Sequence, residues 1–250
     1  LLAEVDALGA PEIVLVAQDL ASFGRDQGQG ERSIIPLVQA VAERVERVRL
    51  LYLYPSDLTE ELIDTIIGTG VPYFDLSLQH VSRPLVRRMR RWGEGSVFLE
   101  RIRRIRGLAP DAALRSSFIV GYPGETEEDQ DRLLAFVEEA RLDWCGFFPY
   151  SPEEGTYAAD LDGVVDGSLV RERLAELTEL QDRITAEKRI ELIGSRVDVL
   201  VDEPGVARSH REAPEIDGII EVTPTLAAGS FHTVEITDAR GPDLMADQTR

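Results

Sequence analysis

Arg115-Ser-Ser-Phe-Ile-Val-Gly-Tyr-Pro-Gly-Glu-Thr126 is the stretch that best indicates the fold of this chain. Its apolar run Phe118–Val120 is typical of a buried strand. Two glycines around a proline then predict a sharp turn, and the segment Thr126–Asp129 predicts a capped helix start. Such a strand, turn and helix place backbone N–H groups, Glu125 and Arg115 at one end of a sheet, where α/β proteins bind small ligands. A tight connection without a ligand fits this stretch equally well.

The chain up to about residue 193 alternates between strand and helix patterns. This alternation indicates parallel pairing with right-handed crossovers. Five strands are too few for a closed eight-stranded barrel. The expected fold class is therefore α/β, with an open sheet or partial (βα) barrel, and its expected strands are 13–17, 48–54, 73–78, 114–120 and 144–150.

A different pattern begins near residue 193. A long helix is expected from Ser168 to about Ile193, because its apolar residues repeat along one stripe and a glycine follows as a stop signal. Short apolar runs separated by Pro and Gly come next, with the spacing of a small all-β barrel. We therefore expect two domains, 1–193 and 194–250.

Composition limits the ligands that the chain can bind. The net charge of −19 argues against a broad nucleic-acid surface and fits a basic protein partner. The C-terminal module is also acidic and has Phe231 as its only aromatic residue, which counts against RNA as its ligand. Arginines dominate only from Arg83 to Arg106, which indicates either a binding patch or the exposed faces of amphipathic helices.

The chain offers few groups for binding metals or crossing membranes. Cys145 is the only cysteine, and the three histidines lie far apart, so neither a disulfide nor a zinc site is expected. No apolar run approaches about eighteen residues, and a soluble cytoplasmic protein is expected. The chain begins at Leu1 in helical register, and we expect it to be part of a longer protein.

Polar residues follow each expected strand. Any one of these clusters could be a helix cap or a turn, but in a parallel sheet the carboxyl ends of all strands share one mouth. Five clusters in succession therefore predict a binding site. They are Gln18-Asp19 with Ser22, Tyr54-Pro55, Gln79-His80, Gly121 to Glu125, and Tyr150-Ser151-Pro152.

Four of these segments resemble the radical S-adenosylmethionine (SAM) methylthiotransferases, and the run Ala213–Gly218 is similar to the TRAM barrel of the same enzymes. Together the matches extend over essentially the whole chain. The resemblance implies an open partial (βα) barrel lacking its first strand, followed by a small all-β, OB-like TRAM barrel. The matching segments are Val14–Gly24, Asp75–His80, Arg115–Thr126 and Tyr150–Thr156.

The resemblance also implies a substrate. The pair Gln18-Asp19 favours the branch that adds a methylthio group to an aspartate of small-subunit ribosomal protein 12. The sister branch, which modifies a tRNA adenosine, carries Gln-Asn at this place. Ribosomal proteins are basic, so the acidic TRAM domain is expected to dock one by long-range steering, and nucleic acid is not expected as a partner. The alternatives are a tRNA adenosine methylthiotransferase, a radical enzyme without sulfur insertion, and a non-catalytic fragment that binds ribosomal proteins.

The cofactors implied by the resemblance are SAM and two 4Fe–4S clusters. In the family, a Cys-x-x-x-Cys-x-x-Cys loop after the first strand binds one cluster, and an N-terminal domain binds the other. Cluster ligation needs thiolates, and Cys145 alone cannot supply them. The ligands are therefore expected upstream of Leu1, and this chain alone is expected to be inactive.

The resemblance assigns provisional roles to matched positions, without a catalytic residue or metal ligand. One group would line the mouth, an arginine would pair with the cofactor's carboxylate, and the glycine turn would cradle its adenosine. The implied cofactor-binding residues are Gln18, Asp19, Ser22, Gln79, His80, Arg115, Ser117, Gly121, Gly124, Glu125 and Tyr150.

Overall fold

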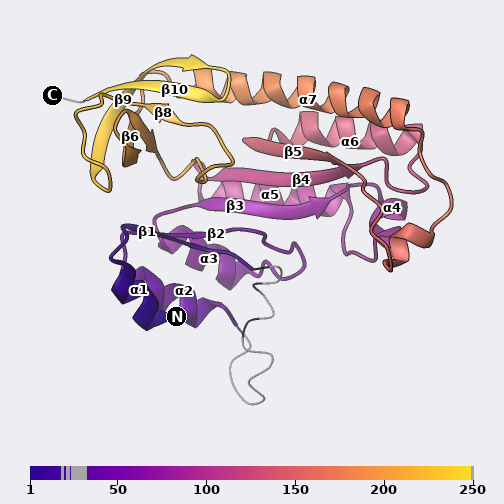
Figure 1. Ribbon diagram of the computed structural model, residues 1–250, viewed down its shortest axis with the longest axis horizontal. Helices are drawn as coiled ribbons and strands as arrows, with labels where there is room; N and C mark the ends of the chain where they lie inside the picture. Colours follow the sequence, from indigo (N-terminus) through magenta and orange to yellow (C-terminus); the bar gives the residue numbers. More distant parts are fainter. Residues whose placement is uncertain (18–19, 21–22, 24–32, 249–250) are drawn as a thin grey trace.

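The core of the molecule is an open array of five parallel strands in chain order (Figure 1). The computed structural model describes all residues except 18–19, 21–22, 24–32 and 249–250. Among the described residues, a two-stranded sheet and a three-stranded sheet meet through one parallel bridge between Leu53 and Leu76. The strands are β1 (Glu12–Leu15), β2 (Arg47–Leu50), β3 (Tyr73–Gln79), β4 (Ala113–Val120) and β5 (Trp144–Pro149).

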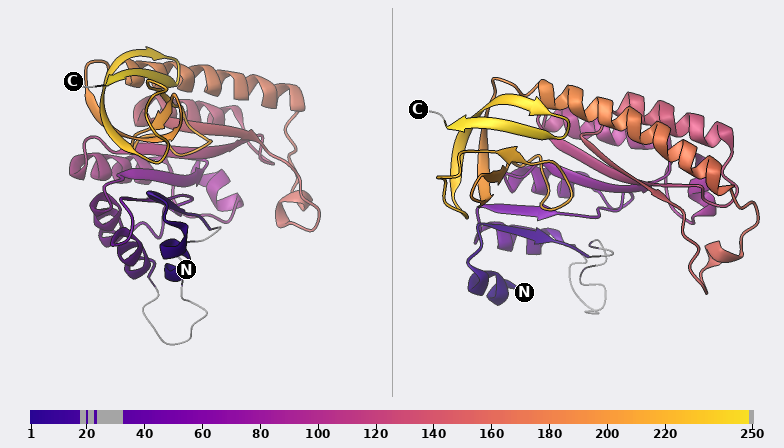
Figure 2. Two further views of the ribbon diagram at one scale, coloured as in Figure 1. Left: turned by 60° about the vertical axis from the view of Figure 1, so that its left-hand side comes forward. Right: turned by 45° about the horizontal axis from the view of Figure 1, so that its top comes forward.

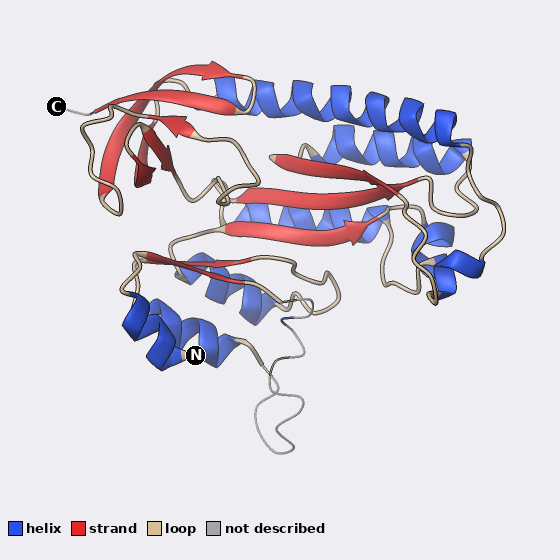
Figure 3. Ribbon diagram, in the orientation of Figure 1, coloured by secondary structure: helices blue, strands red, loops and turns tan. Residues whose placement is uncertain are grey.

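Helices connect the strands and carry the main apolar core between themselves and the sheet. Figures 1 and 3 show α6 and α7 stacked beyond β5, with α1 and α2 at the opposite end of the array. The helices are α1 (Leu2–Leu8), α2 (Ile35–Ala42), α3 (Glu60–Gly68), α4 (Arg83–Arg88), α5 (Gly95–Leu108), α6 (Glu127–Ala140) and α7 (Gly167–Ile190), with a 3₁₀ turn η3 at Tyr157–Asp160.

Local sequence signals explain several boundaries. Thr126 and Asp129 form the expected reciprocal cap at the start of α6. The second strand ends at Leu50, four residues before the expected limit, because Tyr52 adopts φ 60° and its N–H donates to the Asp75 carboxylate. The long helix α7 ends at Ile190, three residues earlier than expected.

The C-terminal part forms a closed five-stranded barrel with its own apolar core. It lies against the amino-terminal ends of the core strands, on the side opposite their carboxyl ends (Figures 1 and 2). The observed architecture is thus the expected α/β partial barrel followed by a small all-β barrel. Its strands are β6 (Arg196–Glu203), β7 (Val206–Arg208), β8 (Ile220–Glu221), β9 (Phe231–Arg240) and β10 (Asp243–Gln248).

None of the helices within the described ranges is both long enough and apolar enough to span a membrane.

Candidate functional site

A hollow of about 400 Å³ opens at the carboxyl ends of β1, β2 and β3. We call it the mouth hollow. Each of the three strands contributes residues at or just past its end, which is where open α/β sheets bind ligands. Two tyrosines, one amide and one guanidinium provide its polar and aromatic character. The lining residues are Val16, Ala17, Tyr52, Tyr54, Ser77, Gln79 and Arg91.

The backbone of the mouth hollow is held in an unusual conformation at two positions. Tyr52 has φ 60° and Gln79 has φ 67°, in the left-handed region that non-glycine residues rarely adopt. A buried carboxylate fixes the first of these, because Asp75 Oδ2 accepts the Tyr52 N–H at 3.0 Å. Strained backbone that the surroundings enforce is characteristic of ligand sites.

Arg91 is held rigidly at the edge of this hollow. The chain turns after α4 through Arg90 at φ 57°, and the Arg91 N–H closes the turn on the Val86 carbonyl. The Arg91 guanidinium carbon lies 4.4 Å from the centre of the Tyr54 ring, and Nη2 donates to the Ser77 carbonyl at 2.7 Å. Burial lowers the pKa of Arg91 from its usual value, since the site partly desolvates the cation.

A second hollow, of about 360 Å³, lies beside the ends of β4 and β5 and contains two of the expected site residues. Gly121 and Tyr150 line it together with Val170 and Leu174 from α7. The expected clusters that lie within the described residues therefore line two separate hollows. Tyr54 and Gln79 line the mouth hollow, whereas the β4 and β5 ends line a largely apolar space against α7.

The glycine turn after β4 is occupied by the chain itself. Gly121 N–H donates to Glu125 Oε2 at 2.8 Å, and Gly124 N–H donates to the Gly163 carbonyl at 2.7 Å. Glu125 is buried and forms an ion pair with Arg173 of α7 at 2.7 Å. Burial raises the pKa of Glu125, although these contacts oppose the rise. The turn's N–H groups at Gly121 and Gly124 and its carboxylate thus have partners within the chain, and the cradling of adenosine by this turn stays a prediction.

His80 also lies away from the mouth. Its side chain is fully buried, and Nδ1 accepts the Ser82 N–H at 3.0 Å. Burial lowers its pKa to about 4, so the ring is neutral near pH 7. The residue shapes the turn between β3 and α4 and does not line the mouth hollow, and its place beside the cofactor stays a prediction. Gln79, its neighbour, does line the mouth hollow.

Arg115 lies deep in the sheet and contacts the C-terminal barrel. Its Nη1 is 3.3 Å from Asp75 Oδ1, and its Nε is 3.3 Å from Asp217 Oδ1. Ser117 Oγ lies 3.4 Å from the same Nη1. Both carboxylates are buried, so the guanidinium is already neutralised within the protein. The pairing of Arg115 with a cofactor carboxylate stays a prediction, and in this structure the guanidinium is paired with Asp75 and Asp217 instead.

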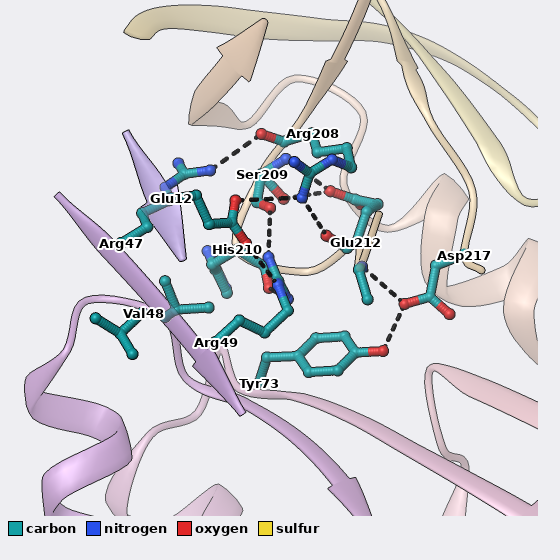
Figure 4. Close-up of polar contacts among 12 residues, drawn as sticks. Glu12, Arg47, Val48, Arg49, Tyr73, Arg208, Ser209, His210, Glu212 and Asp217 are labelled. Carbon is teal, nitrogen blue, oxygen red and sulfur yellow. Dashed lines mark hydrogen bonds and ion pairs between the residues drawn. The ribbon is translucent and has the colours of Figure 1, made fainter. Parts of the chain in front are cut away.

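These contacts extend into a buried polar cluster between the core and the barrel (Figure 4). Glu12 bridges two guanidinium groups, with Arg49 Nε at 2.8 Å and Arg208 Nη1 at 3.2 Å. Tyr73 OH donates to Asp217 at 2.5 Å. We call Glu12, Arg47, Arg49, Tyr73, Arg208, Ser209, Glu212 and Asp217 the interface cluster.

Three expected residues, Gln18, Asp19 and Ser22, lie outside the described residues. Conversely, Tyr52 and Arg91 line the mouth hollow but were not among the expected site residues. The sequence offered a partial signal for them, because Tyr54 ends an expected strand and Arg91 falls in the arginine-rich stretch. Neither signal showed that Arg91 stacks on Tyr54.

The described residues do not fit an iron–sulfur cluster. No group of three His, Cys, Asp or Glu side chains suited to a metal is found within the described ranges. Cys145 lies on β5, and burial raises the pKa of its thiol, which disfavours the thiolate that a cluster needs. The mouth hollow does fit the organic part of a cofactor such as SAM, since it combines aromatic faces with a cation and an amide.

Comparison with known families agrees with this architecture. A family described as the radical SAM superfamily matches residues 14–137, and one described as the TRAM domain matches residues 193–248. Coproporphyrinogen III oxidase (HemN) from Escherichia coli shares the fold, with a TM-score of 0.50 and 16% identity over 61% of this chain and 38% of that one. The two family matches thus identify a radical SAM protein with a C-terminal TRAM domain.

Curated relatives narrow the family. The chain is 42% identical to the ribosomal protein uS12 methylthiotransferase RimO of Cutibacterium acnes, over 95% of this chain and 51% of that protein. It is 45% identical to the protein of the same name from Moorella thermoacetica, over 92% of this chain and 54% of that protein. The chain belongs to the radical SAM methylthiotransferase family, whose cofactors are SAM and 4Fe–4S clusters. It spans about half the length of the curated relatives it matches.

Proposed function

We propose that this chain is the SAM-binding core and TRAM portion of an enzyme that adds a methylthio group to an aspartate of ribosomal protein uS12. The observation that carries the proposal is identity above 40% to two proteins named for this activity, over more than nine-tenths of the chain. The proposed domain boundary lies near residue 193, between the end of α7 and the start of β6.

The mouth hollow is the proposed place of the cofactor. Tyr52 and Tyr54 offer aromatic faces, Gln79 offers an amide, and Arg91 offers a cation. Gln18, Asp19 and Ser22 belong to the same proposed site, because they follow β1 in the chain. When bound, SAM supplies the radical chemistry, and the residues of this chain orient it and limit access of water. The roles of Gly121, Gly124 and Tyr150 are proposed to be structural.

The cluster ligands are proposed to lie in residues outside this chain, so that the chain alone is inactive. Iron analysis tests this directly. The chain reconstituted with iron and sulfide under anaerobic conditions should retain no stoichiometric iron, whereas a longer protein with the preceding residues should. Stoichiometric binding of iron by residues 1–250 alone would contradict the proposal.

The acidic barrel is proposed to dock the basic ribosomal protein. Two acids of β6 already serve the fold, since Asp202 binds Arg208 at 2.6 Å and Asp198 accepts from Thr233 at 2.6 Å. The accessible acids Glu203, Glu221 and Asp247 are exposed and remain candidates for contact with a partner. A ribosomal substrate would also place the protein in the cytoplasm.

Charge reversal can show whether uS12 binding depends on the barrel surface or only on the net charge of the protein. Replacing Glu203, Glu221 and Asp247 by Lys should weaken binding of purified uS12 by about tenfold or more, with a stronger effect at low salt. The control reverses three exposed acids of the core, Asp131, Glu172 and Glu179, and so changes the net charge equally. Equal weakening in both variants would mean that the barrel is not the docking surface.

Mass spectrometry tests the substrate. In cells that lack this gene, uS12 should lose the mass of one methylthio group, and the intact gene should restore it. If uS12 is unchanged and a tRNA adenosine loses its methylthio group instead, the alternative substrate replaces the one proposed.

A further inference from the structure

Arg91 is the only charged side chain among the described residues that line the mouth hollow. It is half-buried, in a protein whose net charge is −19. Within the described part of the chain it forms no ion pair with a carboxylate, and its partners are the Tyr54 ring and the Ser77 carbonyl. Burial lowers its pKa, and Tyr54 opposes that effect. A partly desolvated cation without a carboxylate is costly, so this arrangement calls for an explanation.

Five other inward-facing arginines of this protein have carboxylate partners. Their exposed side-chain fractions are all small, and each forms at least one ion pair within the molecule. The pairs are Arg49–Glu12, Arg115–Asp75, Arg173–Glu125, Arg189–Glu212 and Arg208–Asp202. Arg47 and Arg106 donate to backbone carbonyls and form no ion pair in the described part of the chain, but Glu12 and Asp143 respectively raise their pKa values against burial. For Arg91, which lines the mouth hollow, Tyr54 alone opposes the effect of burial.

The guanidinium is prepared for a partner. The turn after α4 fixes the backbone of Arg91. The guanidinium packs over the Tyr54 ring, and Nη2 donates one hydrogen bond to the Ser77 carbonyl. A guanidinium carries five N–H donors, and a planar fork held in this way matches a carboxylate with little loss of rotamer freedom. Gln79, in the same hollow, offers further amide donors.

We propose that Arg91 is the residue that binds a ligand carboxylate in the mouth hollow. The identity of the ligand rests on the proposed function, which supplies two sources of this group. One is the amino-acid carboxylate of SAM, and the other is an acidic side chain of the polypeptide substrate. Either carboxylate would accept hydrogen bonds from the guanidinium N–H groups that do not donate to the Ser77 carbonyl.

The test uses two matched variants. Arg91→Met keeps the length and apolar stem of the side chain but removes its charge and donors. Arg90→Met is the control, because Arg90 is adjacent and also stacks on a tyrosine, Tyr157, at 3.7 Å, but does not line the hollow. Arg91→Lys keeps the charge without the fork and should restore binding only in part.

The affinity of each purified chain for each probe is measured by titration, and in the chains that keep Arg91 its Nε–H resonance is followed as well. The probes are S-adenosylhomocysteine, 5′-methylthioadenosine (which lacks the amino-acid group), and a lysine-rich peptide carrying either one aspartate or one asparagine. If SAM is the source of the carboxylate, Arg91→Met should weaken binding of S-adenosylhomocysteine by about tenfold or more and leave binding of 5′-methylthioadenosine unchanged. If the polypeptide substrate is the source, Arg91→Met should weaken binding of the aspartate peptide and of none of the other probes.

The proposal is overturned if S-adenosylhomocysteine and the aspartate peptide bind Arg91→Met as tightly as the wild type. It is also overturned if both adenosine probes weaken equally, since that result indicates a structural effect. If the wild type binds none of these probes, the proposed function fails. A titration with succinate, a small dicarboxylate, then tests the Arg91 carboxylate site by itself. An unmoved Nε–H resonance in succinate overturns the carboxylate site, whereas a shift that Arg90→Met retains supports it.

Discussion

Gly121 illustrates how neighbouring helices fix a single backbone position. It has φ +79°, and a Cβ there would meet Val170 Cγ2 of α7 at 2.4 Å. Gly155 has the same φ of +79°, but a Cβ at that position would have no atom within 4 Å. Comparing Ala substitutions at the two glycines therefore distinguishes the free-energy cost of a left-handed backbone from the cost of a steric clash.

We expect Gly121→Ala to lower the free energy of unfolding by about 3 kcal/mol, against about 1 kcal/mol for Gly155→Ala. The difference reflects the collision with Val170, and urea denaturation followed by circular dichroism measures it. Equal losses of unfolding free energy in the two variants would mean that α7 shifts away from the new methyl group without a measurable loss of stability.

Asp217 gives the molecule a pH-dependent contribution to its stability. Burial raises its pKa from 3.8 to about 6, although Tyr73, the Ala213 N–H and Arg115 favour the ionised form. A carboxyl whose pKa is higher in the folded state binds more protons when folded. Its contribution to stability is therefore lost as the pH rises from about 4 to about 6.

The variant Asp217→Asn isolates this contribution. The free energy of unfolding of the wild type minus that of Asp217→Asn should fall by about 2 kcal/mol between pH 4 and pH 6. Urea denaturation at pH 4, 5, 6 and 7 provides the curve. As a control for the substitution itself, Asp247→Asn, at an exposed acid of the same barrel, should change the free energy of unfolding by less than about 1 kcal/mol. A difference for Asp217 that rises with pH would contradict the sign of its shift.

Helix α7 is the element that joins the two halves of the molecule. Its expected apolar stripe is confirmed, with Leu177 and Ile184 fully buried and Val170, Leu174 and Leu180 packed against the same core. Polar residues of the helix are also buried, and Gln181 donates to the Leu142 carbonyl at 3.0 Å. The helix thus fastens to the sheet through both apolar and polar contacts.

Two isoleucines on α7 provide a matched pair. We expect Ile184→Ala to lower the free energy of unfolding by about 3 kcal/mol, because it leaves a cavity in a closed core. Ile190→Ala, at a position that is 58% exposed, should cost less than about 1 kcal/mol. Chemical denaturation checks both, and similar losses would show that α7 does not seal the core at Ile184.

Sequence patterns predicted the elements better than their limits. The strand at 114–120 and the capped start of α6 were predictable because an apolar run and a Thr–Asp cap act locally. The early end of β2 was not, because it depends on Asp75, a carboxylate from the next strand. Element boundaries set by distant partners cannot be inferred from local propensity.

Across the molecule as a whole, the interface cluster joins the barrel to the amino-terminal ends of the core strands. Glu12 lies in β1, Arg49 in β2 and Arg208 in β7, so one carboxylate connects three elements far apart in the chain. Removing one partner of a buried ion pair leaves an uncompensated charge. The two domains should therefore depend on each other for stability.

Glu12→Gln should lower the free energy of unfolding by about 3 to 5 kcal/mol, because it leaves Arg49 and Arg208 short of a carboxylate. The control Glu4→Gln removes an exposed acid of α1 and should change stability by less than about 1 kcal/mol. Thermal unfolding followed by circular dichroism measures both. If Glu12→Gln unfolds like the control, the cluster does not hold the barrel in place.

The site was only partly predictable, for a reason visible in particular residues. Gln79 was identified from its position after a strand, and it lines the mouth hollow. The internal partners of Arg115 could not be predicted, because sequence order does not show that Asp217, about a hundred positions later, folds back to pair with it. Arg91 was missed because a run of arginines on a helix does not reveal which one turns inward.

Fold class, the order of strands and helices, and the family all follow from the sequence alone, since each depends on local periodicity or on contiguous motifs. Which polar groups are free to meet a ligand follows only from the tertiary structure. The Gly121 turn, which first pointed to the fold, is filled by α7, whereas Arg91 faces the mouth hollow without an acidic partner in the described part of the chain. The physical reason is that a charge or a donor is available only when the folded chain has not already satisfied it, and that depends on contacts between distant residues.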